Sequence, residues 1–239
     1  MRQDRRAADQ IRKVVLEPNF SPYAEGSILI SMGGTKVLCN ASVEDSVPPW
    51  FRSEGKKGGW VTAEYSMLPR STHTRNRRER HGPSGRSQEI QRLIGRALRA
   101  SVNLEELGER TITVDCDVLQ ADGGTRTASI TGGYVALRIA MQKLINENQL
   151  SKDALGPAVA AISAGIVSNT PMLDLCYQED SSAEVDANFV INANEQIVEV
   201  QGTAEGKPFS RSDFDLILNM AQKGTSELIE AQSRAISLL

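Results

Sequence analysis

The chain has 239 residues, of which 40% are hydrophobic and 24% charged, and its net charge is −3 at neutral pH. This composition is typical of a folded globular protein in water and excludes a chain that is disordered throughout. No segment approaches the roughly 18 uninterrupted apolar residues of a membrane-spanning helix, and the charged N-terminus has no apolar core behind it, so we expect a cytoplasmic protein without a membrane partner. Cys39, Cys116 and Cys176 lack metal-binding spacing, which favours small core side chains over a disulfide or zinc site.

The first quarter of the chain predicts antiparallel strands. Residues 28–32 and 37–43 alternate in polarity on either side of the turn Met32-Gly33-Gly34-Thr35, which predicts a β-hairpin. A further strand is expected near residues 11–16, and strand character resumes at residues 60–65, after a region rich in proline and glycine.

The segment 70–99 is strongly basic. It holds nine arginines, no lysine and only two glutamates, a net +7 within a molecule whose total is −3. Guanidinium groups bind phosphate through two hydrogen bonds and stack on bases, so this segment predicts a surface for a polyphosphate such as RNA. For the first part of the segment, the alternative is a flexible, solvated loop. We call this first part the arginine loop; its arginines are Arg70, Arg75, Arg77, Arg78 and Arg80.

A strand, a glycine turn and a helix start follow one another in the middle of the chain. Residues 111–118 alternate in polarity, two glycines break the strand at 123–124, and apolar residues recur at helical spacing over 128–145. The first backbone N–H groups of such a helix lack partners within it, and they would lie beside Thr125 and Arg126. The corner predicts a phosphate site, and the alternative is an ordinary capped helix with a solvated arginine.

The remaining pattern indicates an α+β fold. Apolar residues recur at helical spacing over 90–102, and a last helix is expected from about Asp213. Strands are predicted at 158–166, 172–177, 185–191 and 197–201. Two groups of strands, each followed by helices and joined by short polar turns, indicate pseudo-duplicated βα units that share one core, with residues 1–239 in a single domain.

Four carboxylates crowd into the eight residues 179–186. Asp180, near the end of one predicted strand, and Asp186, near the start of the next, are expected to face each other across a hairpin mouth, a geometry that suits Mg²⁺. Strand alternation puts Asn188 on the same face as Asp186. An acidic surface turn is the alternative interpretation.

Eight motifs, in order along essentially the whole chain, resemble the ribonuclease PH family. They are Ala24-Glu-Gly-Ser, Thr35-Lys-Val-Leu-Cys, Thr62-Ala-Glu-Tyr, Met67-Leu-Pro-Arg, Thr72-His-Thr-Arg, Glu89-Ile-Gln-Arg-Leu-Ile-Gly-Arg, Asp115-Cys-Asp-Val-Leu-Gln-Ala-Asp-Gly-Gly-Thr-Arg-Thr-Ala-Ser-Ile-Thr-Gly and Glu199-Val-Gln-Gly-Thr-Ala-Glu-Gly. The resemblance implies a ribosomal protein S5 domain 2-like fold with mixed sheets, and a homohexameric ring built as a trimer of dimers. It also implies phosphorolytic trimming of RNA 3′ ends, chiefly of tRNA precursors. That reaction is a reversible nucleotidyl transfer that releases nucleoside diphosphates.

The resemblance also implies roles for individual residues. The co-substrate, inorganic phosphate, would bind at Arg86, Gly124, Thr125 and Arg126. Asp180 and Asp186 would hold Mg²⁺ and would act in catalysis together with Arg126, while the five loop arginines would hold RNA and shape the ring interface. The two histidines, His73 and His81, lie in the arginine loop, where RNA stacking or exposure is a better interpretation than catalysis.

Two other classes of function stay open. An inert ring subunit of the same superfamily would bind RNA without cleaving it, and it would be expected to lack the phosphate arginine or the aspartate pair, both of which are present here. A hydrolytic nuclease would have no need of a phosphate pocket. A nucleotide-driven enzyme is disfavoured because neither common nucleotide-binding glycine motif occurs.

Overall fold

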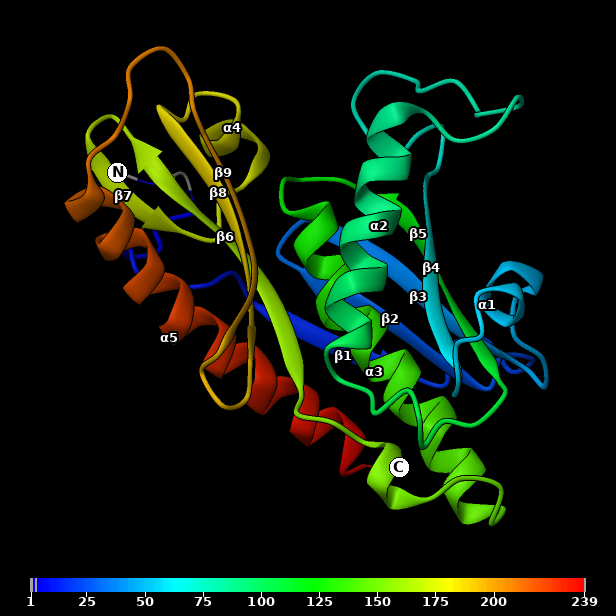
Figure 1. Cartoon of the computed structure of the whole chain (residues 1–239). Coiled ribbons are helices and arrows are strands. Elements are labelled where there is room, and N and C mark those ends of the chain that lie inside the picture. The colour runs from blue at the N-terminus through cyan, green and yellow to red at the C-terminus, as the bar shows by residue number, and fades with distance from the viewer. Residues whose placement is uncertain (1, 3, 239) are drawn as a thin grey trace.

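Two β-sheets pack on either side of one long helix in the computed structural model, which describes residues 2 and 4–238 (Figure 1). The first sheet has the order β1-β2-β3-β5-β4. Its strands are β1 (Val14–Pro18), β2 (Gly26–Met32), β3 (Thr35–Glu44), β4 (Trp60–Met67) and β5 (Thr111–Gln120). Neighbouring strands are antiparallel except β4 and β5, which are parallel and are joined by a crossover that contains α2 (Gly85–Arg99).

The second sheet has the order β7-β6-β8-β9 and is antiparallel. Its strands are β6 (Val159–Val167), β7 (Thr170–Leu173), β8 (Val185–Asn192) and β9 (Ile197–Ala204). The other helices are α1 (Pro49–Ser53), α3 (Thr125–Asn146), α4 (Tyr177–Asp180) and α5 (Arg211–Ile236), with a short 3-10 turn at Lys152–Ala154. This arrangement confirms the predicted α+β fold.

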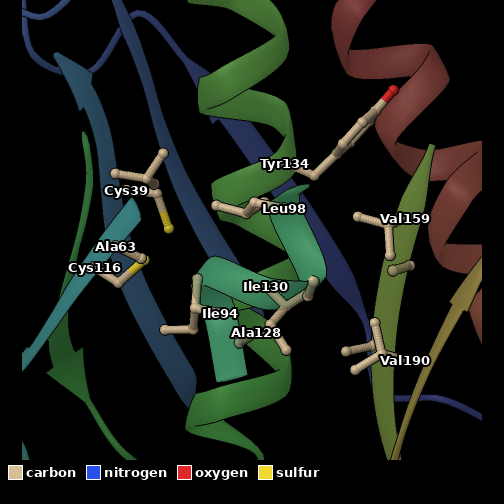
Figure 2. Close-up of a cluster of buried hydrophobic side chains, with 14 of the residues drawn as sticks. Cys39, Ala63, Ile94, Leu98, Cys116, Ala128, Ile130, Tyr134, Val159 and Val190 are labelled. Atoms are coloured by element: carbon tan, nitrogen blue, oxygen red, sulfur yellow. The ribbon is translucent and has the colours of Figure 1, made fainter. Parts of the chain in front are cut away.

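Helix α3 lies between the two sheets and belongs to both cores. It packs on β2 and β3 of the first sheet and on β6 of the second, while α5 covers the outer side of the second sheet (Figure 1). Figure 2 shows Ala128 and Ile130 of this helix between α2 and the second sheet, with Cys39 and Cys116 on the first sheet. Both cysteines are buried free thiols. The helix approaches β2 so closely that a Cβ atom at Gly26 would lie 1.9 Å from the Ala136 carbonyl oxygen.

Two elements end earlier than the sequence predicts. The helix expected over 90–102 ends at Arg99, and Val102 instead forms a lone β-bridge with Leu155. The strand expected over 172–177 ends at Leu173, because Asp174 adopts a left-handed conformation with φ of 53°. Among the described residues, no helix is long and apolar enough to cross a bilayer.

A buried ion pair joins the N-terminal segment to the end of β7. The Asp174 carboxylate accepts hydrogen bonds from Arg12 at its backbone N (2.7 Å), Nε (3.0 Å) and Nη2 (2.6 Å). Arg12 Nη1 donates to the Asp122 carbonyl oxygen at 2.6 Å. Arg12 is 3% exposed and Asp174 fully buried, so the pair fixes three distant segments to one another: the N-terminal segment, the β5–α3 turn and the β7–α4 link.

We predict that Asp174→Asn lowers the free energy of unfolding by about 3–5 kcal/mol, because Arg12 then keeps a buried charge without its counter-ion. Asparagine tolerates the left-handed conformation and has nearly the same volume, so the substitution keeps the packing and removes the charge together with one hydrogen-bond acceptor. Urea unfolding followed by circular dichroism measures the effect. Asp9→Asn, which breaks the exposed Asp9–Lys223 ion pair, serves as the matched control and should change the stability far less. Equal losses in the two variants would contradict the prediction.

Candidate active site

A cavity of about 780 Å³ lies where the two sheets and α3 meet; we call it the central cavity. It brings together residues that are distant in the sequence. Its lining includes Arg86 from α2, Gly124, Thr125 and Arg126 at the start of α3, Asp180 from α4, and Asp186 from β8. The six residues to which the resemblance assigns phosphate or Mg²⁺ therefore lie around a single cavity.

Glycine makes the turn at the start of α3 possible. Gly123 and Gly124 have φ angles of 74° and 64°, in the left-handed region that other L-residues rarely adopt. A Cβ atom at Gly123 would also lie 2.6 Å from the Leu175 carbonyl oxygen. Because the Gly124 carbonyl accepts the first helical hydrogen bond, from Ala128 N at 2.9 Å, the preceding N–H groups have no partner within the helix. These groups and the positive end of the helix dipole suit an anion.

Buried hydrogen bonds hold the glycine turn in place from the side of the core. Thr35 Oγ1 donates to the Gly123 carbonyl oxygen at 2.6 Å and accepts from Asp122 N at 2.9 Å. Arg12 Nη1 also donates to the Asp122 carbonyl oxygen, directly before the two glycines. The turn is thus fixed before any ligand binds.

Tyr65 supports the first residue of α3. Its hydroxyl lies 2.8 Å from Thr125 Oγ1, and both side chains are buried. Burial raises the pKa of Tyr65 and outweighs the opposite effects of the Thr125 hydrogen bond and of the Arg86 and Arg126 charges, so the hydroxyl stays a neutral partner of Thr125 near neutral pH. Strand alternation predicted Tyr65 in a strand but gave no signal for this contact.

Arg126 is held by residues of α2 and β9. Its Nη1 donates to Gln201 Oε1 at 2.9 Å and lies 3.6 Å from Glu89 Oε1. Gln201 Nε2 in turn donates to Glu89 Oε1 at 3.1 Å. The sequence analysis assigned no role to Gln201 or Glu89, although both lie in motifs that carry the resemblance, because their contact depends on how the two sheets pack.

Asp180 does not lie at a hairpin mouth, and that prediction is wrong. It ends the short helix α4, which begins at a reciprocal cap: Cys176 N donates to Glu179 Oε2 at 3.0 Å. Arg2 fixes the same glutamate, with Nε and Nη2 each 2.7 Å from a carboxylate oxygen. Asp186 lies in β8, as predicted, so a helix and a strand supply the two carboxylates. The left-handed turn at Asp174, not alternation, sets this geometry.

The two aspartates share an electrostatic environment that disfavours a double negative charge. Burial raises the pKa of Asp186 to about 6, and the neighbouring Asp180 charge adds to the rise while Arg126 and Arg86 oppose it. Burial also raises the pKa of Asp180, against the same two arginines. One buried oxygen of Asp186, Oδ1, has no hydrogen-bond partner in the described structure.

A hard cation fits this pair. Buried carboxylate oxygens without a donor are suited to Mg²⁺, which takes one or two protein carboxylates and completes its shell with water and phosphate oxygens. No group of three or more His, Cys, Asp or Glu side chains could hold a metal in the described part of the chain. Among the described residues, Asp180 and Asp186 are the carboxylates of the central cavity that could hold such a cation.

The arginine loop lies between β4 and α2 and extends beyond the end of α2 (Figure 1). All five arginines to which the resemblance assigns RNA contacts are exposed. Arg77, Arg78 and Arg80 line a second cavity, of about 770 Å³, which shares Arg86 with the central cavity. Arg70 and Arg75 line neither cavity. Of the two histidines, His73 lines the central cavity and His81 does not.

Comparison with protein families finds two consecutive matches. The model of the 3′ exoribonuclease family, domain 1, matches residues 10–142, and that of domain 2 matches residues 158–224. The chain is 58% identical to the ribonuclease PH of Maricaulis maris (strain MCS10) over 238 residues, which cover 99% of each chain. It is also 58% identical to the ribonuclease PH of Methylobacterium sp. (strain 4-46), over 99% of this chain and 100% of that protein.

Solved structures share the fold at much lower identity. The rice (Oryza sativa) Rrp46 crystal structure superposes with a TM-score of 0.80 at 16% identity, covering 99% of this chain and 100% of that one. The Archaeoglobus fulgidus exosome with RNA bound to the active site gives a TM-score of 0.77 at 23% identity, covering 96% of this chain and 91% of that one. From the family matches and the near-complete alignment with these relatives, we conclude that the chain belongs to the ribonuclease PH family of 3′ exoribonucleases.

Proposed function

We propose that this chain shortens RNA from the 3′ end, with inorganic phosphate as the attacking group and nucleoside diphosphates as products. The observation that carries the proposal is the meeting of the start of α3, which suits an anion, with two half-buried carboxylates in one cavity. Arg86, Gly124, Thr125 and Arg126 would bind phosphate through guanidinium and backbone N–H groups. We further propose that tRNA precursors are the main substrate. The working form is a cytoplasmic homohexamer of three dimers, in which residues 1–239 of each chain act as one functional domain. The family resemblance supports these proposals.

The reaction needs charge neutralisation more than covalent chemistry. An oxygen of the bound phosphate attacks the phosphorus of the last phosphodiester, and the bond from that phosphorus to the preceding 3′ oxygen breaks. The terminal nucleotide leaves as a diphosphate, and the 3′ oxygen takes up a proton. Arg86 and Arg126 would align two anions that otherwise repel each other. Because the new bond is a phosphoanhydride, an excess of nucleoside diphosphate should extend RNA.

Asp180 and Asp186 would act at the leaving oxygen. Without a bound cation, the pKa of Asp186 of about 6 leaves roughly a tenth of these carboxyls protonated at pH 7, and this minority form could deliver a proton there. Mg²⁺ held by the pair would supply charge stabilisation for the same oxygen. An inert subunit would need neither arrangement, and a hydrolytic nuclease would need no phosphate-binding corner.

The requirement for phosphate gives the direct test. A 3′-tailed tRNA should be shortened only when inorganic phosphate is present, and chromatography should identify nucleoside diphosphates as the products. Arg126→Ala should lower the rate by roughly 100- to 1000-fold, because a charge-assisted contact to the reacting anion is lost, while tRNA affinity stays near that of the wild type. Release of monophosphates in phosphate-free buffer would refute the proposal.

The raised pKa of Asp186 predicts a pH-dependent stability effect. A carboxyl with a folded pKa of about 6 and an unfolded value near 3.8 binds more protons in the folded state, so its ionisation destabilises the fold as pH rises from about 4 to 6. Asp186→Asn should therefore be more stable than wild type at pH 8, by on the order of 1–3 kcal/mol, and nearly equal to it at pH 4.

Urea unfolding in EDTA at both pH values measures this difference. Asp9→Asn is the control with the opposite sign, since Lys223 lowers the pKa of Asp9 and its charge stabilises the fold at pH 8. A stability gain for Asp186→Asn that does not change with pH would show that packing, and not charge, is responsible.

The structure divides the arginine loop into two groups for an RNA-binding test. If Arg77, Arg78 and Arg80 contact RNA phosphates, replacing all three by glutamine should weaken tRNA binding and reduce the log–log salt slope by roughly 0.7 to 0.9 per lost contact. Replacing Arg70 and Arg75, which line neither cavity, should have a smaller effect. Fluorescence anisotropy at several salt concentrations gives the slopes, and sedimentation checks the ring. Unchanged slopes in an intact ring would identify a solvated loop.

A further inference from the structure

Gln201 lies in β9 of the second sheet and contacts both α2 and the start of α3, where phosphate is proposed to bind. Its side-chain amide lies between Arg126 at the start of α3 and Glu89 in α2. We propose that Gln201 is a positioning residue that orients the Arg126 guanidinium toward phosphate. This inference rests on the proposed function, in which Arg126 binds the attacking anion.

Both protein contacts of Arg126 use the same nitrogen. Nη1 donates to Gln201 Oε1 at 2.9 Å and lies 3.6 Å from Glu89 Oε1. In the described part of the chain, no hydrogen bond or ion pair engages Nε or Nη2. A planar guanidinium binds a phosphate through two parallel N–H groups on one edge, and the Nε–Nη2 edge has the required geometry. Gln201 therefore holds one side of the arginine and leaves a two-donor edge for the anion.

The orientation of the Gln201 amide is fixed by its neighbours. Nε2 donates to Glu89 Oε1 at 3.1 Å and to Glu199 Oε1 at 3.2 Å. Because carboxylates only accept hydrogen bonds, the NH₂ group must face them and the amide oxygen must face Arg126. Glu199 is itself fixed by Arg96, whose Nε and Nη2 lie 2.8 Å and 2.6 Å from its two oxygens. A chain of directed hydrogen bonds thus runs from α2 through β9 to Arg126.

A neutral amide suits this position better than a carboxylate. Glutamine accepts a hydrogen bond from Arg126 without adding a negative charge that would compete with phosphate. Glu89 already places one carboxylate 3.6 Å from the guanidinium, and its side chain is 43% exposed, so solvent weakens that attraction. Arg126 is held in place and yet is not neutralised by a buried partner.

The test compares the phosphate KM, the tRNA KM and kcat in four variants. Gln201→Leu should raise the phosphate KM by roughly tenfold, the loss expected for one hydrogen bond to a charged group, and leave the tRNA KM unchanged. Arg52→Gln is the matched control, because it removes an arginine from an exposed ion pair, that with Glu109, outside the central cavity and outside the hydrogen-bond chain to Arg126. Its phosphate KM should stay within about twofold of the wild-type value.

Glu89→Gln should act in the opposite direction. An amide oxygen still accepts from Gln201, but the competing charge beside Arg126 is gone, so the phosphate KM should fall by roughly threefold. General damage to the site would raise the phosphate KM in both variants and could not produce opposite signs. If Gln201→Leu fails to fold, the phosphate KM of Glu89→Gln still tests whether this hydrogen-bond network acts on Arg126.

The outcomes separate this inference from the proposed function. A folded Gln201→Leu protein with a phosphate KM within twofold of wild type overturns the positioning role, as does an unchanged or raised KM in Glu89→Gln. Arg126→Ala is the fourth variant: if it keeps the wild-type phosphate KM, Arg126 does not bind phosphate and the positioning role fails with it, whereas shortening of RNA by the wild-type protein without phosphate would overturn the proposed function itself. Loss of phosphorolysis in Arg126→Ala together with a normal Gln201→Leu enzyme would overturn the positioning role alone.

Discussion

The burial of α3 against both sheets is the constraint on which the remaining structure depends. The helix supplies core residues to each sheet, so neither half of the chain completes its hydrophobic core without it. Burial on all sides also fixes where the helix begins. The glycine turn that precedes it must fit between β3 and the link to α4, a space that admits no side chain at Gly123. The position of the glycine turn, where we propose that phosphate binds, is therefore a consequence of how the two sheets share one helix.

The electrostatics of the central cavity follow from this packing. The half-buried aspartates come from the second sheet and α4, while the arginines come from α2 and α3, and the two sets meet only because the halves are joined around α3. Each set moderates the other: the arginines lower the pKa values that burial raises, and the carboxylates would limit the positive charge that a bound phosphate meets. In the proposed reaction, such a balance would let one small space accept an attacking anion and release an alcohol.

Local patterns predicted the fold well and the site in part. Alternation and helical spacing located most strands and the three long helices, and the glycine pair indicated the turn before α3, because these signals depend on residues close in sequence. The position of Asp180 could not be predicted in this way. It depends on a left-handed Asp174, whose carboxylate is bound by Arg12, 162 residues away in the chain. The contacts of Gln201 and Tyr65 depend likewise on distant packing, and spacing gave no reason to place Arg86 beside the turn.

The contact between Arg2 and Glu179 gives the first residues of the chain an influence on chemistry carried out far along it. Arg2 is 6% exposed, and besides Glu179 it donates to the Asp174 carbonyl oxygen at 2.9 Å. Glu179 directly precedes Asp180 and also caps the helix that carries it. Removing Arg2 would therefore take away a support of the helix while leaving every residue of the central cavity intact.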